Sequence, residues 1–261
     1  MAYLCLEVLE MKFANFGDVE IAYLDEGVGQ PVLLIHGFAS KAAVNWVYPG
    51  WVKSLTGAGY RVIALDNRGH GESTKFHDPA RYEPDLMAGD ALALLDFLEI
   101  RKAKVIGYSM GSRLMTFLTL AAPERVERLV FGGMGENLVK GVGRWEPIAQ
   151  ALEAESIDDV SDETGRKFRA FADQTGSDRL ALAACIRPSR QKITEAQLAQ
   201  INHPALVVVG TDDDVAGSGD ALADMLNNGR SFPLPGRDHM KAVGDKNFKR
   251  AVLDFFAEEL A

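Results

Sequence analysis

The amino-acid sequence predicts an α/β fold with a mostly parallel central sheet and helices on both of its faces. Three observations support this class. Compact apolar runs of the kind that form buried strands alternate with stretches of helical spacing along most of the chain. Each apolar run ends at a polar or glycine-bearing turn. The 261 residues are 47% hydrophobic and 25% charged, a composition typical of a globular protein with one sizeable core.

An opening hairpin is the exception to this alternation. Residues 13–16 and 19–24 are short extended runs separated by Gly17 and Asp18, a turn pair that joins antiparallel neighbours. The buried strands then follow as apolar runs at residues 32–35, 62–65, 105–106, 129–131 and 206–209. A short strand at residues 230–234 completes the predicted sheet.

Helices are predicted between and after these strands. Residues 86–100 have apolar positions at helical spacing. Residues 110–122 form a second helix that stops before Pro123, because proline cannot continue a helix. A last helix is predicted for residues 247–260.

One long stretch breaks the pattern. Residues 135–201 contain no convincing strand but several helix-like pieces, and they lie between two core strands. Such an insertion is expected to form a lid over the strand ends. Two further helices covering the sheet are the alternative. The predicted organisation is therefore a core of residues 1–134 and 202–261 with a helical lid of residues 135–201.

Charge and cysteine content exclude several classes of partner. A net charge of −9 at pH 7 repels phosphate backbones and anionic membranes, so neither nucleic acid nor a membrane is expected as a partner. Cys5 and Cys185 lie far apart without metal-ligand spacing, which indicates neither a disulfide framework nor a zinc site. Residues 1–10 lack the features of an export signal, and no window reaches the roughly 18 apolar residues of a membrane helix. A cytoplasmic protein is predicted, and nothing in the sequence specifies its oligomeric state.

The strongest local signal is a G-x-S-x-G motif at residues 107–111. It directly follows the strand at residues 105–106 and directly precedes a predicted helix, which is the context that a nucleophile elbow requires. The flanking glycines permit a sharp turn that a Cβ would obstruct. The serine of this motif, Ser109, is the candidate nucleophile.

A second signal is His36-Gly37-Phe38, which follows the strand at residues 32–35. A tetrahedral oxyanion needs two N–H donors, one from the residue after the nucleophile and one from the loop after an early strand. Met110 and Phe38 are the candidates for these two donors. His36 precedes the nucleophile and adjoins a strand end, which favours a loop-fixing role over a catalytic one.

Residues 66–73, Asp-Asn-Arg-Gly-His-Gly-Glu-Ser, look like the D-x-R-G-x-G-x-S turn of many α/β-hydrolases. With the serine motif, this block gives the sequence a resemblance to the α/β-hydrolase family that covers nearly the whole chain. The resemblance implies an α/β-hydrolase fold with a lid. It also implies a structural role for the block, so that His70 is a buried loop histidine.

The same resemblance implies the acid and the base. The family carries its acid after the strand that follows the lid and its histidine after the last strand. Residues 210–215, Gly-Thr-Asp-Asp-Asp-Val, resemble a G-x-x-D pattern whose register selects Asp213 and leaves Asp212 and Asp214 as alternatives. A later Gly-Arg-Asp-His-Met turn resembles the one that carries the base, which implies His239.

These residues suggest a serine hydrolase in which Ser109 attacks, His239 acts as general base and Asp213 orients the histidine. The leading hypothesis is cleavage of a small carboxylic ester or lactone through an acyl-enzyme, without a metal or an organic cofactor. A carbon–carbon-bond hydrolase, a thioesterase and a cofactor-free perhydrolase are alternatives that would use the same triad. A ligand-binding receptor on a hydrolase fold is the alternative that is not an enzyme.

Three lid residues are candidates for substrate contact. Trp145 and Phe171 would shape the pocket, and Arg187 would pair with a substrate carboxylate. Solvent-facing arginines on helices are common, so a purely structural Arg187 is the alternative.

Overall fold

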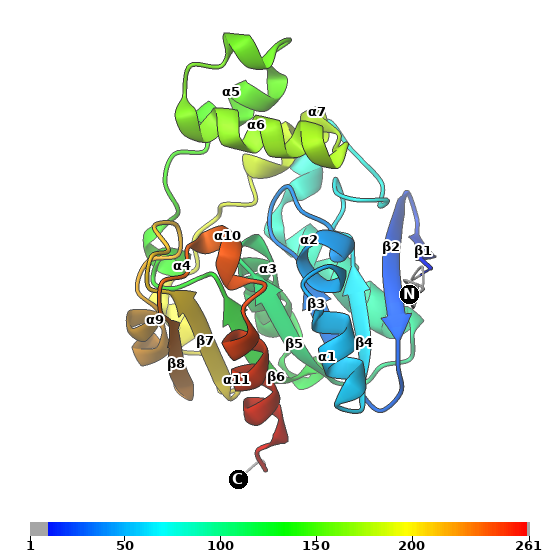
Figure 1. Cartoon of the computed structure of the whole chain (residues 1–261). Coiled ribbons are helices and arrows are strands. Elements are labelled where there is room, and N and C mark those ends of the chain that lie inside the picture. The colour runs from blue at the N-terminus through cyan, green and yellow to red at the C-terminus, as the bar shows by residue number, and fades with distance from the viewer. Residues whose placement is uncertain (1–9, 260–261) are drawn as a thin grey trace, which may run out of the picture.

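The computed structural model describes residues 10–259. Its centre is an eight-stranded sheet with the strand order β1-β2-β4-β3-β5-β6-β7-β8 (Figure 1). β1 pairs antiparallel with β2, as does β2 with β4, and all other neighbours are parallel. The fold class predicted from the sequence is therefore confirmed. The strands are β1 (Lys12–Phe16), β2 (Val19–Glu26), β3 (Gln30–Ile35), β4 (Tyr60–Leu65), β5 (Ala103–Tyr108), β6 (Val126–Gly132), β7 (Ala205–Gly210) and β8 (Gly229–Leu234).

Consecutive residues of the inner strands enter two different cores. In β3, Leu33 and Ile35 pack into one hydrophobic cluster, whereas Val32 and Leu34 pack into another on the opposite face. Both faces of these strands are buried, which explains why they occur in the sequence as continuous apolar runs rather than as alternating ones.

Helices cover both faces of the sheet (Figure 1). The cluster that contains Val32 is completed by α1 (Trp51–Gly57) and α11 (Lys246–Ala257). The cluster that contains Leu33 is completed by α2 (Pro84–Phe97), α3 (Met110–Ala121) and α9 (Gly219–Met225). The three helices predicted from the sequence correspond to α2, α3 and α11 with slightly shifted ends. α1 was not predicted.

The strand order reverses between β3 and β5. β4 lies on one side of β3, and β5 to β8 continue the sheet on the other side. In open α/β sheets, ligands bind outside the carboxyl ends of the strands at such a switch point. The loops that follow β3 and β5 are therefore the segments that the topology places at a site.

Three helices form a separate layer beyond one end of the sheet (Figure 1). They are α5 (Glu146–Glu153), α6 (Glu163–Thr175) and α7 (Arg179–Ile186), which we call the α5–α7 layer. Its hydrophobic cluster includes Ile148, Leu152, Ala172, Leu182 and Ile186, and it extends to Ala39 in the loop after β3. α4 (Asn137–Lys140) and α8 (Glu195–Leu198) belong to the same expected insertion, but Leu138 and Leu198 pack in the core of the sheet.

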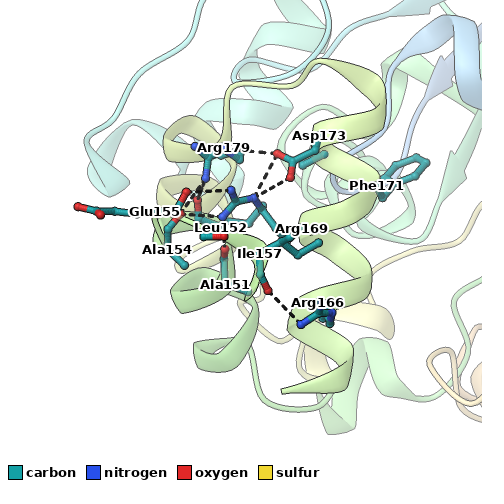
Figure 2. Close-up of polar contacts among 12 residues, drawn as sticks. Ala151, Leu152, Ala154, Glu155, Ile157, Arg166, Arg169, Phe171, Asp173 and Arg179 are labelled. Carbon is teal, nitrogen blue, oxygen red and sulfur yellow. Dashed lines mark hydrogen bonds and ion pairs between the residues drawn. The ribbon is translucent and has the colours of Figure 1, made fainter. Parts of the chain in front are cut away.

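Arg169 joins the helices of this layer to one another (Figure 2). Its guanidinium donates to the carbonyl oxygens of Ala151 and Ala154 at 3.1 and 2.7 Å and pairs with Asp173 at 2.9 Å. The last carbonyl groups of a helix have no partner within it, so Arg169 satisfies the end of α5 from α6. Arg179 of α7 donates to the same Ala154 carbonyl at 2.9 Å.

Four short helical segments complete the architecture: η1 (Ala43–Val47), η2 (Pro79–Tyr82), η3 (Pro123–Arg125) and η4 (Ile157–Asp159), with a last short helix, α10 (His239–Ala242). Cys185 is buried with a free thiol. Residues 1–9, which include Cys5 and most of the segment expected to lack an export signal, lie outside the described residues. Between residues 10 and 259, no helix combines the length and apolar character needed to cross a bilayer.

Candidate active site

Ser109 stands at the turn between β5 and α3. Its backbone angles, φ 53° and ψ −112°, lie in a region that residues other than glycine rarely adopt. A Cβ at Gly107 would lie 2.5 Å from the main chain of Gly111, and one at Gly111 would lie 1.9 Å from the carbonyl oxygen of Ile35. The two glycines therefore allow the turn to pack tightly against β3.

Ser109, His239 and Asp213 lie in one chain of hydrogen bonds. Nε2 of His239 is 3.1 Å from Oγ of Ser109, and Nδ1 is 2.8 Å from Oδ2 of Asp213. The side chain of Asp213 is fully buried, and its Oδ1 accepts the N–H groups of Val215 and Ala216, each at 2.9 Å. These bonds fix the carboxylate, which in turn orients the imidazole toward the serine.

The two neighbouring aspartates lie elsewhere. Asp212 is exposed, and its Oδ1 accepts the hydroxyl of Thr211 at 3.0 Å. Asp214 is also exposed. Of the three adjacent carboxylates, the structure brings only Asp213 to the imidazole of His239.

The main chain beside Ser109 offers two N–H groups that find no acceptor within the described residues. One belongs to Met110, the first residue of α3, where helical N–H groups have no partner in the helix. The other belongs to Phe38. Its loop lies against the serine turn, since a Cβ at Gly37 would be 3.5 Å from the Cβ of Ser109. Both positions suit donors to a developing oxyanion.

His36 and His70 are buried beside this loop. Burial lowers the pKa of His36 to about 4 and that of His70 to about 3, so both rings are neutral at pH 7. Nε2 of His36 accepts the N–H of Asn67 at 3.0 Å, which joins the loops after β3 and β4. The two imidazole centroids are 5.2 Å apart. These contacts are those of loop-fixing histidines.

Nowhere in residues 10–259 do three or more His, Cys, Asp or Glu side chains form a group that could hold a metal ion. The arrangement described above could supply a nucleophile, a base and two fixed N–H donors.

Comparisons with known proteins agree with this architecture. A model of the alpha/beta hydrolase fold matches residues 30–140. The 2-hydroxymuconate semialdehyde hydrolase of Pseudomonas sp. (strain CF600) is 32% identical over 219 residues, 73% of each chain. The non-heme chloroperoxidase CPO-A1 of Kitasatospora aureofaciens is 27% identical over 268 residues, 91% of this chain and 96% of that protein. The crystal structure of a hydrolase from Pseudomonas aeruginosa PA01 superimposes with a TM-score of 0.80 at 28% identity, covering 95% of this chain and 98% of that one.

The chain belongs to the α/β-hydrolase family. The relatives support a hydrolase enzyme, and their names cover more than one reaction. The α/β-hydrolase fold expected from the motifs at residues 66–73 and 107–111 is therefore correct.

The three lid candidates of this α/β-hydrolase lie in two places. Trp145 and Arg187 line a cavity between the two segments that join the α5–α7 layer to the sheet. The Arg187 guanidinium lies 5.9 Å from the Trp145 ring centroid and pairs with Glu153 at 2.7 Å. Phe171 is half-buried on α6, where it packs against the core of the layer and stands apart from the Arg169 contacts (Figure 2).

Two residues that position the site were not recognised from the sequence. Oδ1 of Asn45 accepts the N–H of Gly37 at 2.9 Å and so fixes the Phe38 loop. The hydroxyl of Tyr108, the residue before the nucleophile, donates to the main-chain carbonyl of His239. Only the place of Tyr108 inside the G-x-S-x-G motif could have drawn attention to it.

Proposed function

We propose that the protein is a cytoplasmic serine hydrolase that cleaves a small carboxylic ester or lactone through an acyl-enzyme. The observation that carries this proposal is the chain of hydrogen bonds from Ser109 through His239 to Asp213. The unpaired N–H groups of Phe38 and Met110 beside that chain support it further.

The reaction follows from these positions. Oγ of Ser109 attacks the carbonyl carbon while Nε2 of His239 takes the hydroxyl proton. The N–H groups of Phe38 and Met110 donate to the oxyanion of the tetrahedral intermediate. When this intermediate collapses, the C–O bond of the ester breaks and His239 returns the proton to the departing alkoxide. Water, deprotonated by the same imidazole, then attacks the acyl carbon; the bond to Oγ of Ser109 breaks, His239 returns the proton to Oγ, and the acid is released.

Asp213 supports both steps without exchanging a proton. Its buried carboxylate accepts Nδ1–H of His239 and stabilises the imidazolium that forms in each tetrahedral intermediate. The two backbone N–H groups on its other oxygen hold it in place.

A carbon–carbon-bond hydrolase is the second candidate. The likeness to the 2-hydroxymuconate semialdehyde hydrolase, 32% identical over 219 residues, favours it. The same serine, histidine and aspartate would serve such a reaction, so the distinction lies in the substrate and not in the triad.

The experiment is a substrate panel combined with active-site labelling. The purified protein is assayed with short and long acyl esters, lactones, thioesters and a dienoic diketone acid, and a fluorophosphonate is used to label the nucleophile. Ser109→Ala should lose the labelling and about four orders of magnitude in rate. The matched control is Ser218→Ala, which removes an exposed serine that caps α9. Undiminished labelling of Ser109→Ala would refute the proposal, and turnover of the diketone acid alone would favour the second candidate.

A further inference from the structure

A cavity of about 480 Å³ lies between the two segments that join the α5–α7 layer to the sheet. The first segment is residues 140–145 and the second is residues 187–192. Its lining residues include four basic side chains and neither Asp nor Glu. In a chain with a net charge of −9, this is an unusual concentration of positive charge. The basic residues are Lys140, Arg187, Arg190 and Lys192.

Two of the four cations already have carboxylate partners. Lys140 pairs with Glu136 at 2.6 Å, and Arg187 pairs with Glu153 at 2.7 Å. Because these ion pairs offset their charge, the remaining two cations determine what the cavity attracts.

Arg190 and Lys192 have no ion-pair partner within residues 10–259. The side chain of Arg190 donates to the carbonyl of Val142 at 2.6 Å, and burial lowers its pKa. Lys192 lies across the other segment, since a Cβ at Gly141 would be 2.6 Å from its Cε. The side chains of Arg190 and Lys192, both in the second segment, therefore contact the first segment at this cavity.

A further buried cation lies behind the cavity. Arg113 of α3 is 1% exposed and donates only to main-chain carbonyls, those of Leu138 at 3.2 Å and of Gln191 at 2.6 Å. Gln191 is one of the lining residues. Burial, and then the positive charge of Arg190, lower the pKa of Arg113 to about 10. The two guanidinium groups thus repel each other, and neither forms an ion pair with a carboxylate of the described residues.

The other buried arginines of the described residues differ from Arg113 in their ion pairs. Each has a carboxylate partner: Arg68 with Asp90 at 2.6 Å, Arg169 with Asp173 at 2.9 Å and Arg128 with Glu258 at 4.0 Å. An uncompensated buried charge is costly, and an anion from solution removes that cost. The cavity therefore lacks the negative charge that this protein supplies elsewhere.

We propose that the cavity is a binding site for a small oxyanion that bears carboxylate or phosphate groups, held chiefly by Arg190 and Lys192. Guanidinium groups present paired N–H donors that match both kinds of anion, and an ammonium adds a point charge. Because the anion contacts both connecting segments, its binding ties the α5–α7 layer to the sheet. The site is independent of the ester cleavage proposed above, since none of Ser109, His239 and Asp213 lines it.

Thermal unfolding of the full chain tests this site without reference to activity. The protein is titrated with inorganic phosphate and, in a second series, with citrate, while sodium chloride keeps the ionic strength constant. A saturable rise in Tm of about 5 °C is expected at an anion concentration about a hundred times its Kd. A larger effect of citrate identifies a carboxylate ligand, and a larger effect of phosphate identifies a phosphorylated one.

Variants separate specific binding from the general salting effect of these anions, which rises steadily and does not saturate. Arg190→Met should abolish the saturable rise in Tm. In Lys192→Met, the anion concentration that gives half of this rise should increase at least tenfold. Arg144→Met is the matched control, because Arg144 lies in the first segment but is 83% exposed and does not line the cavity. If Arg190→Met fails to fold, Lys192→Met decides. No saturable rise with either anion, or an equal rise in the cavity variants and the control, would overturn the proposal.

Discussion

The phenol of Tyr108 donates to the main-chain carbonyl of His239, and its ring centroid lies 5.6 Å from that of the imidazole. The ring also packs closely against β6, because a Cβ at Gly132 or Gly133 would lie 2.8 or 2.7 Å from it. Burial raises the pKa of Tyr108, so the hydroxyl remains a donor at neutral pH. Tyr108 thereby joins the end of β5 to the start of α10, where His239 lies.

Replacing Tyr108 by Phe should lower kcat about tenfold, because the start of α10, which carries the imidazole, is held less firmly. KM should change little, and Tm should fall by about 2–4 °C in this variant because a carbonyl loses its donor while the ring and its packing remain. Steady-state kinetics across pH 5–9 and calorimetry measure these effects. Tyr82→Phe is the control: Tyr82 is equally buried, and its hydroxyl donates to the carbonyl of Phe76 at 2.6 Å, within another loop. An equal loss of kcat in both variants would contradict a positioning role for Tyr108.

The three adjacent aspartates give a second prediction. Asp213→Asn should reduce kcat by about four orders of magnitude, because an amide cannot hold the imidazole in the required tautomer. Asp212→Asn and Asp214→Asn should stay within about twofold of the original enzyme, since exposed carboxylates contribute little. Parallel kinetics on the three variants, with circular dichroism to verify folding, test this. A loss of several orders of magnitude in kcat for Asp214→Asn would mean that the catalytic acid is not the residue in contact with His239.

The strands could be predicted because their signal is local. Residues 62–65 and 206–209 lie within β4 and β7 and are buried on both faces, so each appears as an uninterrupted apolar run. α1 was missed for the opposite reason. Trp46 and Trp51 are both fully buried, but they belong to a π-helical turn and a seven-residue helix, which are too short to show a period.

The site also contains parts that a local sequence pattern predicts and parts that it does not. The serine turn is specified by five consecutive residues, so its sequence pattern is sufficient to locate Ser109. The contact between Tyr108 and His239 joins residues 131 positions apart, and neither local pattern specifies the other. The basic cavity likewise needs two segments that are distant in sequence, and neither segment specifies the other.

The hydrogen bonds from Arg169 to the end of α5 give a third prediction. Arg169→Met removes one donor from each of two carbonyls: that of Ala151 loses its side-chain partner, and that of Ala154 keeps only the bond from Arg179. Amide exchange within residues 146–186 should become about 10- to 100-fold faster, while exchange in the sheet is unchanged. Arg166→Met is the control on the same helix, since Arg166 is exposed and donates to Ile157 at 3.1 Å (Figure 2). Uniform acceleration over the whole chain would show that the layer does not unfold locally.

The buried histidines make stability depend on pH in a defined direction. An unfolded chain binds a proton on each histidine below about pH 6.5, whereas native His36 remains neutral down to a pKa of about 4. Between these values the unfolded state holds more protons, so the free energy of unfolding falls as the pH falls, by up to about 1.4 kcal/mol per pH unit for each such histidine. His70, with a pKa of about 3, extends the same effect to lower pH.

Urea titrations between pH 7 and pH 4 measure this fall, and His36→Gln isolates the part due to one residue. Asp66 and Asp90 act in the opposite direction, because burial raises the pKa of each, but they are common to both proteins and cancel in the difference. At pH 7 the variant should be less stable than the original protein, because Asn67 N–H loses its acceptor. The gap between the two free energies of unfolding should shift by about 3 kcal/mol in favour of the variant as the pH approaches 4. A gap that stays constant from pH 7 to pH 4 would mean that native His36 takes up its proton as readily as the unfolded chain does.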